Sequence, residues 1–357
     1  MRLRVTPLKL RLRAPLRAAY GTVSERSLLQ VSLTGSDGIS GHGEAAPLEP
    51  YDGVGIDRVA DAIESYRPAL ESAREIPAAE LLDACRAIDD LPQALAAVDL
   101  ALWDRAGRLR GEPVALLISE RLAACAGAAG AARPLGEVLV NAVISATDRA
   151  GAGEQAAVAR AEGFTCLKVK VGVGDDAGRL AAVRAVAGPH VALRLDANGA
   201  WGVEEAVRAI GSLEAAGLEL VEEPVSGLSS IRAVRERVAV RVAIDETAAE
   251  PGALGSGAAD AVCLKISRCG GISGLLDAAA LVTASGAEPY LASTLDGPLG
   301  IAAALHAAAA LGSQRTLPAC GLATLRMFDG IDDPLPVRNG SIALPRTPGL
   351  GVEPPAC

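Results

Sequence analysis

The chain has 357 residues, too many for one ordinary domain, and this length suits a barrel of about 250 residues with a smaller partner domain. Half of the residues are hydrophobic but only 2% are aromatic, so the core must be built from aliphatic strands and small-residue helices, as in an α/β fold. The net charge of −9 would repel a phosphate backbone, and no basic patch is interleaved with aromatic residues, so nucleic acid is excluded as a partner.

The cysteines and the hydropathy pattern indicate the compartment. Seven cysteines form no CxxC pair, and their odd number argues against a disulfide framework. No apolar signal core follows the basic start, and no stretch is long and apolar enough to span a bilayer once its Gly, Arg and Asp residues are counted. We therefore expect a cytoplasmic protein with reduced thiols and no membrane partner.

Residues 1–120 predict an α+β capping domain. Leucines alternate with basic residues over residues 8–13, and residues 28–33 form a second alternating run, as strands with one buried face do. Helical periodicity starts near Gly55, and residues 93–107 predict an apolar helix that ends at a glycine. The Gly/Ala-rich stretch that follows is typical of a linker.

From residue 138 onward, short β-rich runs alternate with Ala-rich helices. Seven strands are predicted, at 138–144, 165–171, 191–197, 218–224, 240–246, 261–267 and 288–294. Their spacing of roughly 25 to 30 residues is close to one eighth of a barrel and leaves room for right-handed helical crossovers. We predict a (β/α)7β modified TIM barrel over residues 121–319, with a doubly wound open sheet as the runner-up. The Pro/Gly-rich residues 320–357 should return to the capping domain and complete it.

Lysines mark two of the predicted strands near their carboxyl ends, where barrel active sites are assembled. Lys168 and Lys170 lie two residues apart on one strand, so their side chains share a face, and Lys265 lies on the strand after the last carboxylate. Because the residues between and beside the first pair are apolar, an exposed edge strand is disfavoured. Desolvation and mutual repulsion should then lower a lysine pKa toward neutrality and produce a general base.

Carboxylates end the three strands between these lysines. Asp196, Glu222 and Asp245 could each be a helix N-cap, which is the simplest interpretation of any one of them. Three carboxylates converging at a barrel mouth would repel one another unless a hard cation lay between them, and an all-oxygen set without His or Cys favours Mg²⁺ or Mn²⁺ over zinc. A metal that binds a substrate carboxylate, flanked by two lysines, indicates abstraction of the α-proton of a small-molecule carboxylate.

Five motifs, in this order and spacing, resemble the muconate-lactonizing subgroup of the enolase superfamily: LKVKV, RLDANGAW, LELVEEPV, AIDET and CLKISRCGG. The resemblance covers nearly the whole chain. GHGEAAPLEPYDG is similar to the loop region of the family's cap domain, AAVDLALWDRAG to its helix and VRNGSIALPRTPGLGVE to its closing segment. Family habit also implies a homo-oligomer.

The resemblance assigns roles to residues of this chain. Lys170 would be the general base or acid, tuned by Lys168, and Lys265 would be the opposed lysine. The expected Mg²⁺ ligands are Asp196, Glu222 and Asp245. The expected supporting residues behind the ligands are Asn198, Glu223 and Glu246. The expected substrate-binding residues, from two mobile cap loops and the STLDGPLG stretch, are Tyr20, Gly21, Tyr51, Asp52, Ser293, Thr294 and Asp296.

Within the subgroup, the GEAAPL, VEEPV and STLDGPLG contexts and the compact length are most similar to the o-succinylbenzoate synthase family. The similarity implies a lyase of menaquinone biosynthesis, in which Lys170 removes the α-proton and returns a proton to the departing hydroxide while Lys265 stabilises the enediolate. Alternatives are a dipeptide epimerase, an N-acylamino acid racemase, a muconate-type cycloisomerase and, more remotely, a non-catalytic binding barrel. Dipeptide epimerases carry an Asp-x-Asp element on the last strand. Only Asp296 is expected there in this chain, which counts against a dipeptide.

Overall fold

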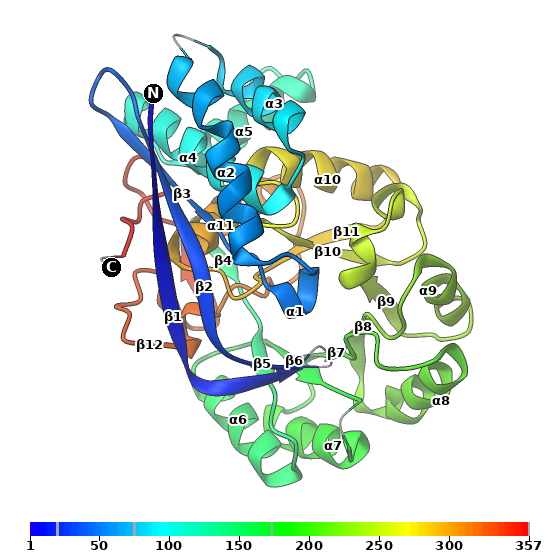
Figure 1. The fold of residues 1–357 in the computed structure, drawn as a ribbon. Coiled ribbons are helices and arrows are strands. Elements are labelled where there is room, and N and C mark those ends of the chain that lie inside the picture. Colours follow the sequence, from blue (N-terminus) through cyan, green and yellow to red (C-terminus); the bar gives the residue numbers. More distant parts are fainter. Residues whose placement is uncertain (19–20, 74–75, 173, 356–357) are drawn as a thin grey trace.

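The computed structural model of the chain describes residues 1–18, 21–73, 76–172 and 174–355. A capping domain of strands and helices, blue and cyan in Figure 1, lies against a barrel of parallel strands, which confirms the predicted fold class. None of the helices within these described ranges combines the length and apolar character needed to cross a membrane.

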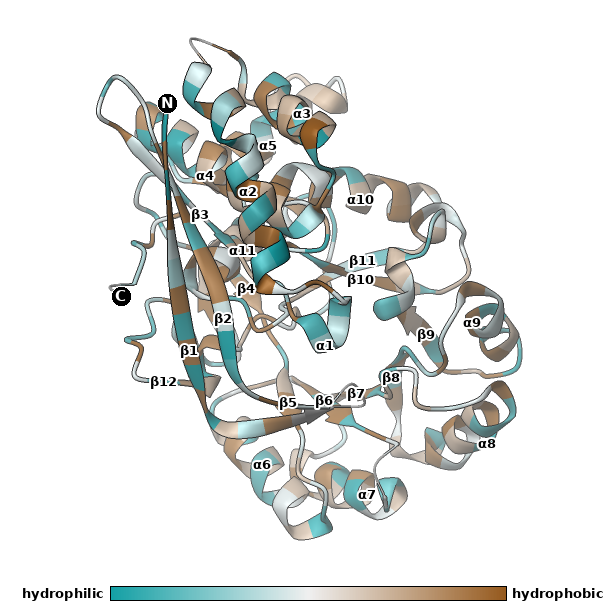
Figure 2. Cartoon of the chain, viewed as in Figure 1, coloured by the Kyte–Doolittle hydropathy of each residue, from teal (hydrophilic) through white to brown (hydrophobic). Residues whose placement is uncertain are grey.

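The capping domain is built on a four-stranded antiparallel sheet. Its strands, in spatial order, are β12 (Phe328–Asp329), β1 (Arg2–Ala18), β2 (Gly21–Thr34) and β3 (Ser40–Ala45). The predicted alternation is confirmed, since the leucines of residues 8–13 are buried and the basic residues between them are exposed. Brown and teal segments alternate along β1 in Figure 2, as expected for a strand with one face on the core.

The cap also contains the helices α1 (Glu49–Asp52), α2 (Ile56–Ser72), α3 (Ala78–Ile88), α4 (Pro92–Arg110) and α5 (Val114–Cys125), of which α2 and α4 pack on the sheet. The helix predicted at residues 93–107 is α4, and it is buried along most of its length. It packs closely on β3 through glycines. A Cβ atom on Gly41 or Gly43 would lie 2.0 Å from a backbone carbonyl oxygen of α4, so the contact requires glycine at both positions.

The seven predicted barrel strands are present and parallel, but the first, predicted over residues 138–144, is divided: residues 137–139 form β4 in a separate antiparallel sheet and only residues 142–144 lie in the barrel. Their spatial order is β11 (Glu288–Ala292), β10 (Ala261–Lys265), β9 (Arg241–Ile244), β8 (Leu218–Glu222), β7 (Ala192–Asp196), β6 (Cys166–Lys170) and β5 (Ala142–Ile144). Between the two ends of this sheet, isolated bridges join Ala292 to Gly321 and Val140 to Cys320. The residues Cys320 and Gly321 therefore occupy the last strand position of the barrel.

Helices connect and enclose these strands: α6 (Arg149–Ala161), α7 (Asp176–Ala187), α8 (Val203–Leu213), α9 (Leu228–Arg235), α10 (Ile272–Ala284) and α11 (Pro298–Gly312). Short 3-10 helices are η1 (Glu214–Ala216), η2 (Glu246–Ala249), η3 (Ala253–Gly255) and η4 (Leu325–Met327). Helices α6 to α9, green in Figure 1, lie outside the barrel wall. Helix α11 is buried along nearly all of its length, because it packs between the barrel and the capping domain.

The chain after α11 contacts both domains. Strand β12 pairs with β1, while β13 (Val337–Arg338), β14 (Ser341–Ala343) and β4 (Glu137–Leu139) form a small antiparallel sheet. Further on, the Leu350 N–H donates to Asp104 Oδ1 on α4 over 2.7 Å, and the Leu350 carbonyl lies 3.0 Å from the His306 ring on α11. The final segment thus ties the cap helices to the barrel.

Candidate active site

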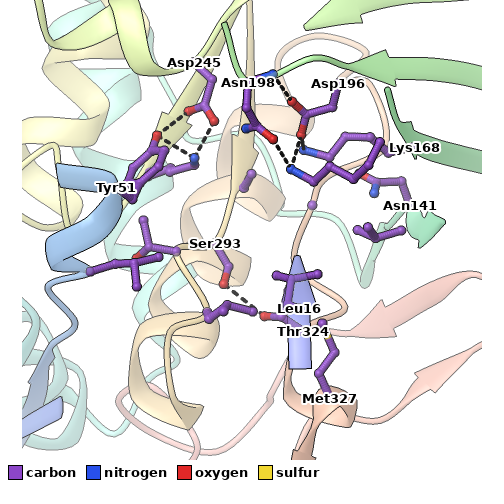
Figure 3. Close-up of a pocket in the computed structure, with 18 residues that line it drawn as sticks. Leu16, Tyr51, Asn141, Lys168, Asp196, Asn198, Asp245, Ser293, Thr324 and Met327 are labelled. Atoms are coloured by element: carbon purple, nitrogen blue, oxygen red, sulfur yellow. Dashed lines mark hydrogen bonds and ion pairs between the residues drawn. The ribbon is translucent and has the colours of Figure 1, made fainter. Parts of the chain in front are cut away.

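The carboxyl ends of the barrel strands open into a pocket that the capping domain covers (Figure 3). Leu16 from β1 and Tyr51 from α1 reach it from the cap side. Nine of the residues predicted from the sequence line this pocket: Tyr51, Lys168, Lys170, Asp196, Asn198, Asp245, Lys265, Ser293 and Thr294. Strand geometry explains the convergence, since parallel strands present their carboxyl ends at the same rim.

The three predicted metal ligands are all buried and lie at the ends of neighbouring strands. Asp196 and Glu222 are register partners on β7 and β8, and the Lys168 ammonium lies between them, 2.9 Å from Asp196 Oδ2 and 3.0 Å from Glu222 Oε1. Carboxylate oxygens of Glu222 and Asp245 lie within 4.8 Å of each other. The Lys168 ammonium shows that Asp196 and Glu222 lie close enough to share one cation. Because the donors of this set are mainly carboxylate oxygens, it fits a hard divalent ion.

The expectation that no cysteine accompanies these carboxylates is wrong. Cys263 Sγ lies within 4.8 Å of ligand oxygens of Glu222 and Asp245. Cys263 precedes Lys265 by two residues on β10, so both side chains face the barrel interior. Burial, strengthened by the two carboxylates, raises the pKa of the Cys263 thiol well above its ordinary value. Because metals bind the thiolate, a thiol that stays protonated leaves oxygens as the principal donors.

Lysines lie on both sides of the carboxylates. Lys170 Nζ is 2.7 Å from Asp196 Oδ2 and donates to Asn198 Oδ1 over 2.6 Å. On the far side, Lys265 Nζ is 2.5 Å from Asp245 Oδ2. Strands β7, β8 and β9 separate the two lysine-bearing strands, so the carboxylates stand between the lysines.

The lowering of a lysine pKa predicted for the Lys168 and Lys170 pair is wrong for Lys168, and Lys265 shows the same direction as Lys168. Burial alone would lower the pKa of each. For Lys168 the carboxylates of Asp196 and Glu222 outweigh burial, and for Lys265 the Asp245 carboxylate does so, and the pKa of both lysines rises above its ordinary value. Attraction by contacting carboxylates therefore dominates over desolvation in this arrangement.

The predicted supporting residues form hydrogen bonds behind the ligands. Glu223 accepts from the Asp245 N–H over 2.7 Å and from both the N–H and the hydroxyl of Thr247, which fixes the start of η2. Asn198 Nδ2 donates to Glu246 Oε1 over 2.9 Å. Asn198 and Glu223 have positive φ angles of 45° and 41°, a conformation that non-glycine residues rarely adopt outside functional sites.

Several polar residues of the site were missed by sequence reasoning, Thr324 among them. Arg268 Nη1 donates to the Tyr51 hydroxyl over 2.6 Å, and the Tyr290 hydroxyl donates to Glu222 Oε2 over 2.8 Å. Tyr290 could have been found, because it occupies an inward position two residues before Ala292, which lines the pocket. A further residue, Asn141, lines the pocket just before β5 and shows no sequence signal that separates it from an ordinary strand residue.

Several predicted substrate contacts are not brought to the pocket. Gly21 is exposed at the start of β2, and the Asp52 carboxylate accepts from the Leu48 and Val54 N–H groups. Asp296 lies beyond β11 and not on the last strand, and its carboxylate accepts from the N–H and the hydroxyl of Thr294. The Asp296 carboxylate therefore stabilises the turn that follows β11. Tyr20 lies outside the described residues.

The Tyr51 side chain joins the capping domain to the chemistry. Its hydroxyl donates to Asp245 Oδ1 over 2.7 Å and lies 2.6 Å from Lys265 Nζ. The same ammonium stands 4.0 Å from the ring centroid. Figure 3 shows the ring beside Asp245 on one side of the pocket, with Asp196 and Lys168 on the other. A movement of α1 in the cap would therefore also move the Lys265 ammonium.

Comparison with known proteins agrees with this geometry. The model of the mandelate racemase / muconate lactonizing enzyme N-terminal domain matches residues 1–119, and that of the enolase C-terminal domain-like family matches residues 151–356. L-Ala-D/L-Glu epimerase of Bacillus subtilis (strain 168) is 29% identical, over 99% of this chain and 96% of its own length. o-Succinylbenzoate synthase of Thermobifida fusca (strain YX) is 37% identical, over 61% of this chain and 72% of its own.

A solved structure is similar to this chain over nearly its whole length. The dipeptide epimerase from Enterococcus faecalis V583, complexed with Mg and the dipeptide L-Leu-L-Tyr, superposes with a TM-score of 0.86 at 26% identity, covering 98% of each chain. The two epimerases thus match over nearly the full length of this chain, whereas the Thermobifida fusca synthase matches over 61% of it. On the matches to both of its domains, the chain belongs to the enolase superfamily, in the mandelate racemase and muconate lactonizing enzyme subgroup.

Proposed function

We propose that this chain is an epimerase or racemase that inverts the α-carbon of an N-acylated amino acid, either a dipeptide or an N-acylamino acid. The observation that carries the proposal is the pair Lys170 and Lys265, on β6 and β10, with the carboxylate-bearing strands between them. Inversion requires one group to remove the α-proton from one face of the carbon and another to deliver a proton to the opposite face. Full-length similarity to L-Ala-D/L-Glu epimerase supports the same conclusion.

Asp196, Glu222 and Asp245 would hold a Mg²⁺ ion, for which Mn²⁺ could substitute. When bound, the ion neutralises the negative charge that develops on the substrate carboxylate as the α-proton leaves. Lys168 contacts both Asp196 and Glu222, so it restricts how these two side chains can turn. Its role in this proposal is to position ligands.

The two lysines transfer the protons. Lys170 Nζ takes the proton from one face, while the Lys265 ammonium supplies one to the other, and the roles exchange for the opposite enantiomer. The Asp245 carboxylate in contact with Lys265 favours the charged form of this lysine, and commitment of Asp245 to a metal ion would weaken that preference. Asn198 and Tyr51 would keep each ammonium oriented through the hydrogen bonds described above.

A second candidate is the o-succinylbenzoate synthase reaction of menaquinone biosynthesis. The 37% identity to the Thermobifida fusca synthase favours it over part of the chain. Dehydration needs only one lysine as acid and base, here Lys170, whereas Lys265 would act as a cationic stabiliser. The number of lysines that exchange protons with the substrate therefore separates the two functions.

Exchange of the α-proton in D2O tests the proposal. Incubation with Mg²⁺ and L-Ala-L-Leu or N-propionyl-L-leucine should replace the α-proton by deuterium and invert the carbon, followed by NMR and polarimetry. Lys170→Ala and Lys265→Ala should each lose inversion by at least a factor of about 100, and each should retain exchange of only one enantiomer. Lys9→Ala, at an exposed position of β1, is the control.

The contrary result is equally definite. If the folded protein exchanges no α-proton in such amino acid derivatives but converts the synthase substrate, with loss of ultraviolet absorbance as the ring aromatises, the epimerase proposal is wrong and the lyase replaces it. Retention of inversion by either lysine variant would also remove the two-lysine mechanism.

A further inference from the structure

The pocket has an ionic end and an uncharged end. The ionic end holds the lysines and carboxylates described above. The other end, which we call the distal subsite, is lined by Ser293, Gly321, Thr324 and Met327, and Asn141 borders it between these residues and Lys168. In Figure 3, Ser293, Thr324 and Met327 lie across the pocket from Asp245 and Asp196. A substrate whose carboxylate is held at the ionic end must therefore extend its remaining groups toward the distal subsite.

Asn141 carries an unsatisfied donor in this subsite. The residue is 3% exposed, and its Nδ2 is buried without a hydrogen-bond partner. Its backbone is fixed, because the Asn141 N–H donates to the Cys320 carbonyl over 3.0 Å. Buried side-chain amides are nearly always hydrogen-bonded, and an exception facing a pocket indicates a group that a ligand satisfies. The ligand atom that fits an N–H donor is a carbonyl or carboxylate oxygen.

Gly321 creates the space beside this amide. A Cβ atom at Gly321 would lie 2.9 Å from Ala292 Cβ and 3.6 Å from Asn141 Oδ1. The last strand position can therefore approach β11 closely only as glycine, and it presents no side chain toward Asn141. The subsite is left with backbone on one wall and a single amide donor on the next.

The hydroxyl groups of the subsite already have partners. Ser293 Oγ and Thr324 Oγ1 lie 2.9 Å apart and share a hydrogen bond, and Ser293 Oγ also accepts from the Asp296 N–H over 3.0 Å. Among the described residues that line the pocket, the only carboxylates are Asp196 and Asp245, and both are paired with lysines. An ammonium group placed in the distal subsite would be buried without a counter-charge, which is costly.

We propose that the Asn141 side-chain amide binds the acyl oxygen of the substrate, and that the distal subsite selects N-acyl groups without an ammonium over the aminoacyl group of a free dipeptide. The inference rests on the proposed function for the class of substrate, and it narrows that class to N-acylamino acids. Leu16, Leu48, Leu295 and Met327 line the same pocket and favour an apolar amino acid side chain.

Two ligands that differ in one group test the subsite. N-propionyl-L-leucine and L-Ala-L-leucine have the same carbon skeleton, and only the second carries an ammonium. Calorimetric binding to the Mg²⁺-loaded protein should be at least about tenfold tighter for the first ligand. Asn141→Ala should weaken binding of N-propionyl-L-leucine by about fivefold to tenfold, the effect of one lost hydrogen bond. Gln314→Ala, at an exposed position after α11, should change neither affinity.

Asn141→Asp should strengthen binding of the dipeptide, and a misfolded variant could not produce such an increase in affinity. A carboxylate at this position supplies the missing counter-charge, so the preference should reverse toward L-Ala-L-leucine. Equal or tighter binding of the dipeptide by the wild type, no binding of either ligand, or an unchanged ratio in the Asn141 variants would overturn the proposal. Binding without α-proton exchange in D2O would instead reject the proposed function and leave the subsite standing, because calorimetry requires no turnover.

Discussion

Glu44 offers a quantitative test of the contact between the two domains. It lies on β3 of the cap and is 2% exposed, and its Oε1 accepts from the Gly297 N–H over 2.7 Å at the start of α11. Its Oε2 is buried without a hydrogen-bond partner. Burial first, and the Asp296 carboxylate second, raise the pKa of Glu44 from 4.5 to about 8, while the Gly297 hydrogen bond and the buried Arg26 guanidinium oppose this rise.

The sign and size of the effect follow from proton linkage. Between pH 4.5 and pH 8 the unfolded chain has already released this proton and the folded protein has not, so stability falls as the pH rises and levels off above pH 8. The gap between the two pKa values corresponds to ~5 kcal/mol, of which ~2 kcal/mol is already lost at pH 6. From pH 6 to pH 9, ionisation of Glu44 should therefore cost ~3 kcal/mol.

Glu44→Gln removes this proton equilibrium while keeping an oxygen acceptor for the Gly297 N–H. The free energy of unfolding in urea, measured at several values between pH 6 and pH 9, should fall less steeply for the variant, by ~3 kcal/mol over the range. Glu80→Gln, at an exposed position of α3, should follow the wild type. Parallel curves for Glu44→Gln and the wild type would refute the reasoning, because every other titrating group is common to both proteins.

Three further predictions concern the cap, the metal and the Tyr51 contact. Gly43→Ala should lower the free energy of unfolding in urea by about 3 kcal/mol, because the new Cβ would lie 2.0 Å from Ala97 O. Gly130→Ala, where a Cβ would meet open space, should change it by less than about 0.5 kcal/mol. Equal effects of the two substitutions would contradict the packing argument. Dialysis against EDTA should abolish α-proton exchange, and Mg²⁺ or Mn²⁺ should restore it; full activity after metal removal would exclude the metal role. Tyr51→Phe should lower kcat/KM at least about tenfold through loss of the hydroxyl contact with Lys265, and an unchanged value would show that this contact is dispensable.

The barrel could be predicted from the sequence because its signals are local. A strand alternates its side chains with a period of two, so Lys168 and Lys170 had to share a face wherever the strand lay. The repeated spacing then placed Asp196 and Lys265 at the same rim. The same period of two places Cys263 on the face of β10 that carries Lys265.

Other features of the site depend on partners distant in sequence. The direction of the lysine pKa change is decided by which carboxylates lie within hydrogen-bond distance, and Lys265 meets Tyr51 from the other domain. Asp296 was predicted to contact the substrate, but its carboxylate accepts hydrogen bonds from the N–H and the hydroxyl of Thr294 in a local turn. The surroundings of Asn141 depend on Gly321, which lies about 180 residues later in the chain and occupies the last strand position.

The pairing of β1 with β12 has a consequence for synthesis of the protein. Leu12 is the register partner of Phe328, and Asp104 on α4 accepts from the Leu350 N–H. The hairpin and helices of the cap are synthesised before the barrel strands, yet one edge of their sheet and Asp104 Oδ1 gain these partners only after the barrel strands have been made. The barrel strands all appear in the interval between. Relative to the barrel, the capping domain is thus begun earlier and completed later.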